Sequence, residues 1–187
     1  VEGKGVQKIN NMIGYNFRLG EVESAIGIEQ LKKLEGFAKS RERMANLLSN
    51  GLSNLDGLKT PVVKEDCSHV YYVYPLVLDV EMLGCSKHKI AEALRAEGVE
   101  VATAYQNIHL IPMYQNKTAY GSNGFPWSAS FARQNIDYSK GICPVAEKLN
   151  DETYLGFGMC VYDLNDEDIN LIIEAFQKVW ENIDHLK

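Results

Sequence analysis

The sequence predicts an α+β fold preceded by one long helix. Two observations predict it: a helical repeat that starts at Glu21, and strand-like segments that alternate with helices in the second half. Of the 187 residues, 45% are hydrophobic and 24% are charged, which excludes disorder, collagen-like repeats and coiled coil for the whole chain. A sheet of three or four strands with helices packed on it accommodates this order of elements.

The N-terminal part is dominated by the long helix. Residues 1–20, rich in Gly and Asn, are expected to be extended. Over 21–54 apolar residues recur at helical spacing with charges between them, and we expect a bend at Gly36. A helix of this length exceeds what one small core covers, so we expect it to bridge two bodies. The apolar positions are Val22, Ile26, Leu34, Phe37, Met44 and Leu48.

Residues 55–187 are expected to form the α+β domain itself. The apolar and β-branched segments predict strands, and the capping residues predict where helices begin. In chain order the expected elements are a buried strand over 69–79, a helix over 86–97 capped by Ser86, a strand over 99–105, an irregular stretch over 106–141, a short helix opened by Pro144, a strand over 153–162 and a final helix capped by Asn165.

Charge and cysteine usage narrow the classes of function. The chain has 19 basic and 25 acidic residues, a net charge of −6, which argues against a nucleic-acid partner because phosphate binding needs a concentrated basic face. No apolar stretch approaches the ~20 residues of a membrane helix. The 4 cysteines form no close pair, so we expect reduced thiols, no metal site and a cytoplasmic protein without a membrane partner.

No motif of a self-contained active site occurs: GxSxG, the P-loop and the Rossmann glycine fingerprint are all missing from the sequence. Two polar concentrations remain as candidate sites. Asn16 and Arg18 precede the expected helix N-terminus, where free N–H groups and a guanidinium suit a phosphate. His109 lies among polar and aromatic residues of the irregular stretch. The sequence favours equally a role in lining a site and a role in packing.

Five stretches, in this order along the chain, carry a resemblance. They are GYNFRL at 14–19 with EVESAIG at 21–27, HVYYVYPLVLD at 69–79, HLIPMY at 109–114, CPVAEKL at 143–149 and LNDEDI at 164–169. Together they resemble the DegT/DnrJ/EryC1/StrS aminotransferases, which use pyridoxal 5′-phosphate (PLP) to aminate keto sugars, mostly nucleotide-linked ones. The resemblance implies the small C-terminal domain of a fold-type-I PLP transferase.

The resemblance also implies roles for residues. Asn16 would reach across a two-fold dimer interface to the PLP phosphate of the neighbouring subunit, and Arg18 would bind the cofactor as well. Tyr15 and Arg18 would lie near the substrate's phosphates, and His109 and Tyr114 would border the sugar pocket. The lysine that forms the Schiff base with PLP would lie upstream of this chain, so no catalytic residue is expected here, and this fragment alone would be inactive.

The implied partners are a keto-sugar substrate, glutamate or glutamine as amino donor, and a second copy in a homodimer with shared active sites. The product would serve cell-surface polysaccharide or amino-sugar biosynthesis. Two alternatives stay open from the sequence. One is a PLP-dependent deoxysugar dehydratase, in which histidine replaces the Schiff-base lysine outside this chain. The other is a non-catalytic α+β binding module.

Overall fold

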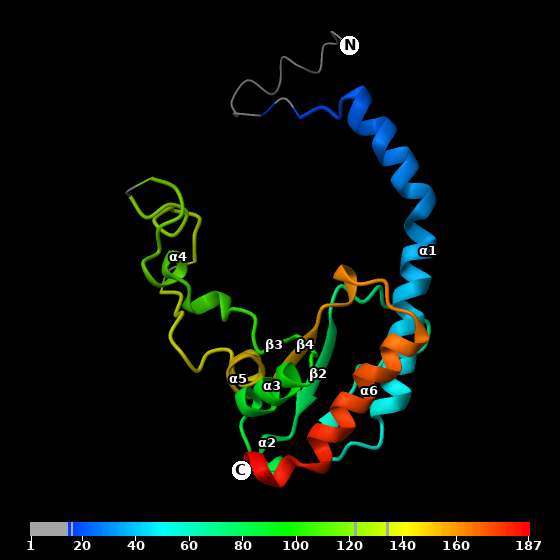
Figure 1. Ribbon diagram of the computed structural model, residues 1–187. Coiled ribbons are helices and arrows are strands. Elements are labelled where there is room, and N and C mark those ends of the chain that lie inside the picture. Colours follow the sequence, from blue (N-terminus) through cyan, green and yellow to red (C-terminus); the bar gives the residue numbers. More distant parts are fainter. Residues whose placement is uncertain (1–14, 16, 122, 134) are drawn as a thin grey trace. The chain divides into compact units, whose positions relative to one another are not determined.

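A computed structural model describes residues 15, 17–121, 123–133 and 135–187 (Figure 1). The chain divides into two compact units, Val1–Phe37 and Ala38–Lys187. Helix α1, Glu21–Leu52, contributes its first part to one unit and the rest to the other. It lies within the segment 21–54 where the sequence predicts one long helix, ends at Leu52 and remains helical through Gly36.

The two parts of α1 differ in burial. In the second unit its apolar residues belong to the core, and Met44, Leu48 and Leu52 are at most 1% exposed. In the first unit the apolar residues of the same helix are exposed, as Val22 (70%) and Leu34 (58%) illustrate. Within the described residues, the apolar repeat is thus buried only over the last turns of the helix.

The second unit is built on a four-stranded sheet of order β1-β2-β4-β3, in which every neighbouring pair is antiparallel. Strands β2 and β4 lie side by side at its centre (Figure 1), with Leu76 opposite Leu155. This confirms the predicted sheet of three or four strands. The strands are β1 (Leu58–Lys59), β2 (Tyr74–Leu78), β3 (Val101–Ala102) and β4 (Tyr154–Phe157).

The strands are shorter than the sequence predicts. The strand expected over 69–79 begins only at Tyr74, because Tyr71 has a φ of 47° and its N–H bonds His69 Nδ1 at 2.9 Å, which turns the chain. The strand expected over 99–105 ends at Ala102. Tyr105 donates its N–H to the Asn150 side chain at 3.0 Å instead of to a neighbouring strand.

Helices follow and cover the strands. Both predicted caps are confirmed: Ser86 Oγ accepts the N–H of Lys89, and Asn165 forms a reciprocal capping box with Asp168. Short helices that the sequence did not predict follow β2 and occupy the irregular stretch. The helices are α2 (Val80–Leu83), α3 (Lys87–Ala96), α4 (Pro112–Gln115), α5 (Pro144–Lys148) and α6 (Asp166–Glu181), with 3-10 turns at Ile108–Leu110, Met159–Val161 and Ile183–Leu186 and a π-helical turn at Leu149–Thr153.

One hydrophobic core joins these elements in the second unit. It combines Leu76 and Leu155 from the sheet with Ile90 from α3, Phe176 from α6 and Leu48 from α1. Each of these five side chains is at most 1% exposed. Among the described residues, none of the helices combines the length and the apolar character that crossing a membrane requires.

Gly51 of α1 offers a test of this packing. A Cβ at position 51 would overlap the Ile173 side chain of α6, so Gly51→Ala should lower the free energy of unfolding by about 1–3 kcal/mol through overpacking. Gly36→Ala is the matched control, because nothing lies within 4 Å of that position, and it should cause no loss. Urea unfolding of both variants measures the difference. A Gly51→Ala variant as stable as the wild type would contradict this packing.

Candidate functional site

The residues expected to bind the cofactor fall in the first unit. Asn16 lies outside the described residues. Tyr15 is 83% exposed and its ring centroid lies 5.7 Å from that of Phe17. Arg18 is exposed as well. Both described side chains are therefore open to a ligand.

The N-terminus of α1 carries acidic residues of its own. Glu21 and Glu23 lie in the first turn, and the Glu23 carboxylate lies against Gly20, just before the helix. These charges already interact with the helix dipole, so the helix end by itself is a poor site for another anion. Among the described residues just before the helix, Arg18 is the cation, and a guanidinium can make charge-assisted hydrogen bonds to an anion.

His109 and Glu147 form a buried contact in the second unit. His109 Nε2 lies 2.9 Å from Glu147 Oε1, and the two side chains are 10% and 8% exposed. The same carboxylate accepts the backbone N–H of Gly141 at 2.8 Å and that of Cys143 at 3.2 Å. Glu147 thus ties the first turn of α5 to both the segment just before it and the 3-10 turn that carries His109.

The hydrogen bonds that the Glu147 carboxylate accepts favour its ionised form. Burial alone would raise the pKa of its carboxyl, but the donors at Gly141, Cys143 and His109 outweigh burial and hold the pKa below its usual value. An ionised Glu147 accepts from His109, so Nε2 of that ring carries a proton. His109 is therefore oriented by Glu147, a residue that the sequence indicated only as part of the 143–149 motif.

Tyr114 organises the stretch that the sequence predicted to be irregular. Its ring lies edge-on to Trp127 with centroids 6.0 Å apart and 5.2 Å from the Tyr138 ring. Trp127 Nε1 donates to the Tyr138 hydroxyl at 2.9 Å. Gln115 adds two bonds, donating to the carbonyl oxygens of His109 and Tyr138 at 2.7 Å each. The stretch is therefore held by side chains rather than by a regular backbone ladder.

The structure brings His109 and Tyr114 together in the wall of one cavity of about 470 Å³, a size typical of small-molecule sites. Two of its amides are engaged with each other, since Asn150 Nδ2 donates to Asn107 Oδ1 at 3.0 Å. The remaining lining residues are Gln106, Ile108, Tyr138, Cys143 and Ala146.

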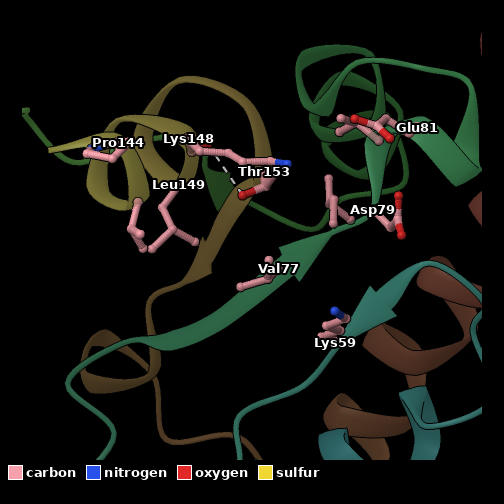
Figure 2. Close-up of a pocket in the computed structure, with 11 residues that line it drawn as sticks. Lys59, Val77, Asp79, Glu81, Pro144, Lys148, Leu149 and Thr153 are labelled. Carbon is pink, nitrogen blue, oxygen red and sulfur yellow. Dashed lines mark hydrogen bonds between the residues drawn. The ribbon is translucent and has the colours of Figure 1, made fainter. Parts of the chain in front are cut away.

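A second cavity, of about 520 Å³, was not predicted (Figure 2). Figure 2 shows Lys148 and Leu149 on one side and Lys59 and Asp79 on the other, with Val77 between them. Its lining comes from separate segments that only the fold brings together, so no local sequence pattern could reveal it. The Asp79 carboxylate is already engaged, accepting the N–H of Met82 at 3.0 Å as the cap of α2.

Glu147→Gln tests the buried contact. The amide removes the negative charge and turns an N–H₂ toward backbone donors, so the segment 106–142 should be released and cut faster by chymotrypsin. Stability should also respond to pH. Because the folded pKa of Glu147 is lowered, its contribution is present above the unfolded value near 4.5 and lost as pH falls through the folded value.

The variant should therefore lose less stability than the wild type between about pH 6 and pH 3 in urea unfolding. Glu174→Gln, an exposed change on α6, is the control and should leave both the cleavage rate and the acid dependence unchanged. Equal behaviour of the two variants would show that the contact does not hold the segment.

Comparisons with known proteins agree with this fold and these motifs. The UDP-4-amino-4,6-dideoxy-N-acetyl-beta-L-altrosamine transaminase of Campylobacter jejuni is 31% identical over 103 residues, covering 55% of this chain and 27% of that protein. GDP-perosamine synthase of Caulobacter vibrioides is 28% identical over 169 residues, covering 90% and 39%. The chain therefore spans less than half the length of these curated relatives.

A solved structure shows the same fold. The structure of DesV from S. venezuelae superposes with a TM-score of 0.67 at 21% identity, covering 91% of this chain and 39% of that one. This likeness confirms the predicted fold, a small sheet with helices packed on it after a long helix. The family model described as the DegT/DnrJ/EryC1/StrS aminotransferase family matches residues 1–155. Because this model matches most of the chain, the chain belongs to the DegT/DnrJ/EryC1/StrS aminotransferase family.

Proposed function

We propose that this chain is part of a PLP-dependent aminotransferase that aminates a nucleotide-linked keto sugar, with glutamate or glutamine as amino donor. The family match over residues 1–155 carries this proposal. Two relatives support the substrate class, because one is named for a UDP-linked and the other for a GDP-linked amino sugar. The product would enter polysaccharide or amino-sugar biosynthesis in the cytoplasm.

The cofactor contacts that we propose lie before α1. When bound, PLP supplies an electron sink for moving a proton between the carbons on either side of the transferred nitrogen. Arg18 would hold its phosphate with charge-assisted hydrogen bonds, and the Asn16 amide would donate to the same group. Two observations support this contact. The Arg18 side chain is exposed, and the carboxylates of Glu21 and Glu23 at the helix end disfavour an anion there, so that the phosphate would bind the guanidinium.

Asn16 would make this contact across a two-fold interface, so that two copies share each site. The exposed apolar side chains of α1 in the first unit support a partner surface there. Tyr15 would lie near the substrate's phosphates together with Arg18. We retain the expected organisation into an extended 1–20, a long helix 21–54 and an α+β domain 55–187.

His109 and Tyr114 would border the sugar. Their place in the wall of one cavity supports this role. His109 would act as a positioned wall residue rather than as a free base, since its Nε2 is engaged by Glu147. Tyr114 would present the part of its ring that Trp127 and Tyr138 leave uncovered.

Catalysis would need a residue from outside these 187 positions. The lysine that bonds PLP is expected in the preceding part of the natural polypeptide, so this chain alone would be inactive. Borohydride reduction of that polypeptide, followed by mass mapping, tests this directly. A pyridoxyl-lysine upstream of Val1 would support the aminotransferase. PLP bound without a lysine adduct would favour the dehydratase, and no PLP at all would favour the binding module.

Substitutions in the natural polypeptide test the cofactor contacts. Asn16→Ala and Arg18→Ala should each weaken PLP retention by roughly ten- to a hundredfold, because a hydrogen bond to a charged group contributes about 1.5–3 kcal/mol. His88→Ala, at an exposed position on α3, is the control and should leave retention unchanged. The PLP absorbance that remains after gel filtration measures retention. Small and equal effects of all three changes would overturn the shared-site proposal.

A further inference from the structure

The hydroxyl of Tyr154 is buried without a partner. Tyr154 opens β4 and is 9% exposed, and its hydroxyl is the one buried side-chain polar atom in the described part of the chain that makes no hydrogen bond. Buried polar groups in folded proteins nearly always have a partner, so an isolated one calls for an explanation. One explanation is that a ligand supplies the missing bond.

Gly156 makes the room that this hydroxyl occupies. Residues 154 and 156 share one face of β4, because side chains alternate along a strand. A Cβ at position 156 would overlap the Tyr154 hydroxyl and would lie 3.1 Å from Val73 Cγ2. The missing side chain lets the Tyr154 ring lie along the strand with its hydroxyl over Gly156.

Two more tyrosines lie beside Tyr154. The ring of Tyr105 is 5.9 Å from that of Tyr154 at an interplanar angle of 58°, and Tyr72 hydrogen-bonds the Tyr105 side chain. Tyr105 and Tyr72 are 54% and 65% exposed. They come from the segment after β3 and the segment before β2, and the N–H bond from Tyr105 to Asn150 fixes the first of these. The three phenols thus form one cluster that is buried at Tyr154 and open to solvent at the other two.

All three phenols are able to donate. Burial, together with the nearby Tyr105 and Tyr72, raises the pKa of Tyr154 to about 12. The hydrogen bond that Tyr105 makes with Tyr72 raises the pKa of Tyr105 above its ordinary value. The hydroxyls of Tyr154 and Tyr105 therefore keep their protons near neutral pH, and a phenol hydroxyl can both donate and accept.

We propose that Tyr154, Tyr105 and Tyr72 form a seat for the pyranose ring of the sugar substrate. The Tyr154 hydroxyl would bond a sugar hydroxyl, and the exposed face of Tyr105 would pack against the C–H groups of the ring. The seat rests on the proposed function for the identity of the sugar, but the unpartnered hydroxyl stands independently of it.

The geometry favours a sugar over a nucleobase or a phosphate. A flat base stacks on parallel aromatic faces, whereas the rings of Tyr105 and Tyr154 meet at 58°. A phosphate would need a cation, which none of the three tyrosines supplies. A sugar hydroxyl both donates and accepts, as a phenol does, and the aromatic faces cover its apolar side.

The test uses the natural polypeptide loaded with its cofactor. Tyr154→Phe removes only the hydroxyl, and Tyr105→Ala removes the stacking face. Tyr120→Phe is the control, because Tyr120 is 72% exposed and its ring pairs only with Phe125 in the described chain. The probes are UDP-N-acetylglucosamine and GDP-mannose, each compared with the free nucleotide by calorimetry, together with KM and kcat for the keto sugar.

We expect Tyr154→Phe to raise KM for the keto sugar and the Kd of a nucleotide-sugar roughly three- to tenfold, the loss of one hydrogen bond. Binding of the free nucleotide, the half-reaction with the amino donor and thermal stability should stay unchanged. Tyr105→Ala should weaken sugar binding in the same direction, and Tyr120→Phe should change nothing.

The outcomes separate the two proposals. Equal weakening of free nucleotide and nucleotide-sugar would place the base in the seat and overturn the inference. Unchanged binding in both tyrosine variants would show that the hydroxyl is satisfied by water alone, and it too would overturn the seat while leaving the aminotransferase intact. If the wild type binds no PLP but Tyr154→Phe still weakens its sugar binding, the proposed function would be overturned and the seat would be supported.

Discussion

The antiparallel pairing of β2 with β4 is the constraint on which the rest of the second unit depends. It joins segments far apart in the sequence over four residue pairs, from Tyr74 opposite Phe157 to Val77 opposite Tyr154. The outer strands are only two residues long and depend on this central pair for their place. The same pairing buries Leu76 beside Leu155 and fixes where Tyr154 stands. The pairing of β2 with β4 therefore determines the positions of both the core residues and the tyrosine cluster.

Outside the sheet, side chains rather than strand pairing provide hydrogen-bond partners for the backbone. The stretch after β3 has little regular structure, so its polar groups need other partners. Glu147, Asn150 and Gln115 provide them by accepting or donating to backbone groups of this stretch. Lys87, only 2% exposed, donates to the carbonyl of Asn150 and so ties α3 to the π-helical turn. Burial lowers the pKa of Lys87, and nearby acidic groups oppose that shift.

What the sequence predicted well was local. The caps at Ser86 and Asn165 depend on neighbours a few residues away, and both are confirmed. The start of the strand expected over 69–79 was mispredicted, because Tyr71 leaves the strand conformation although the composition of this segment favours a strand. The bond between His109 and Glu147 spans 38 residues, and the cluster at Tyr154 joins three segments. Neither has a local signal, since each joins segments that are distant in the sequence.

The motifs seen separately in the sequence turn out to be paired in space. The 109–114 and 143–149 motifs meet through His109 and Glu147, and the 69–79 motif supplies the strand that pairs with β4. The motif that opens α1 is different, because its apolar side chains are exposed and Arg18 is open to solvent. Exposing apolar surface is unfavourable, so packing within the described chain does not explain this motif. Its residues are better explained by a surface that meets a partner and a charged ligand, which is the role proposed for them.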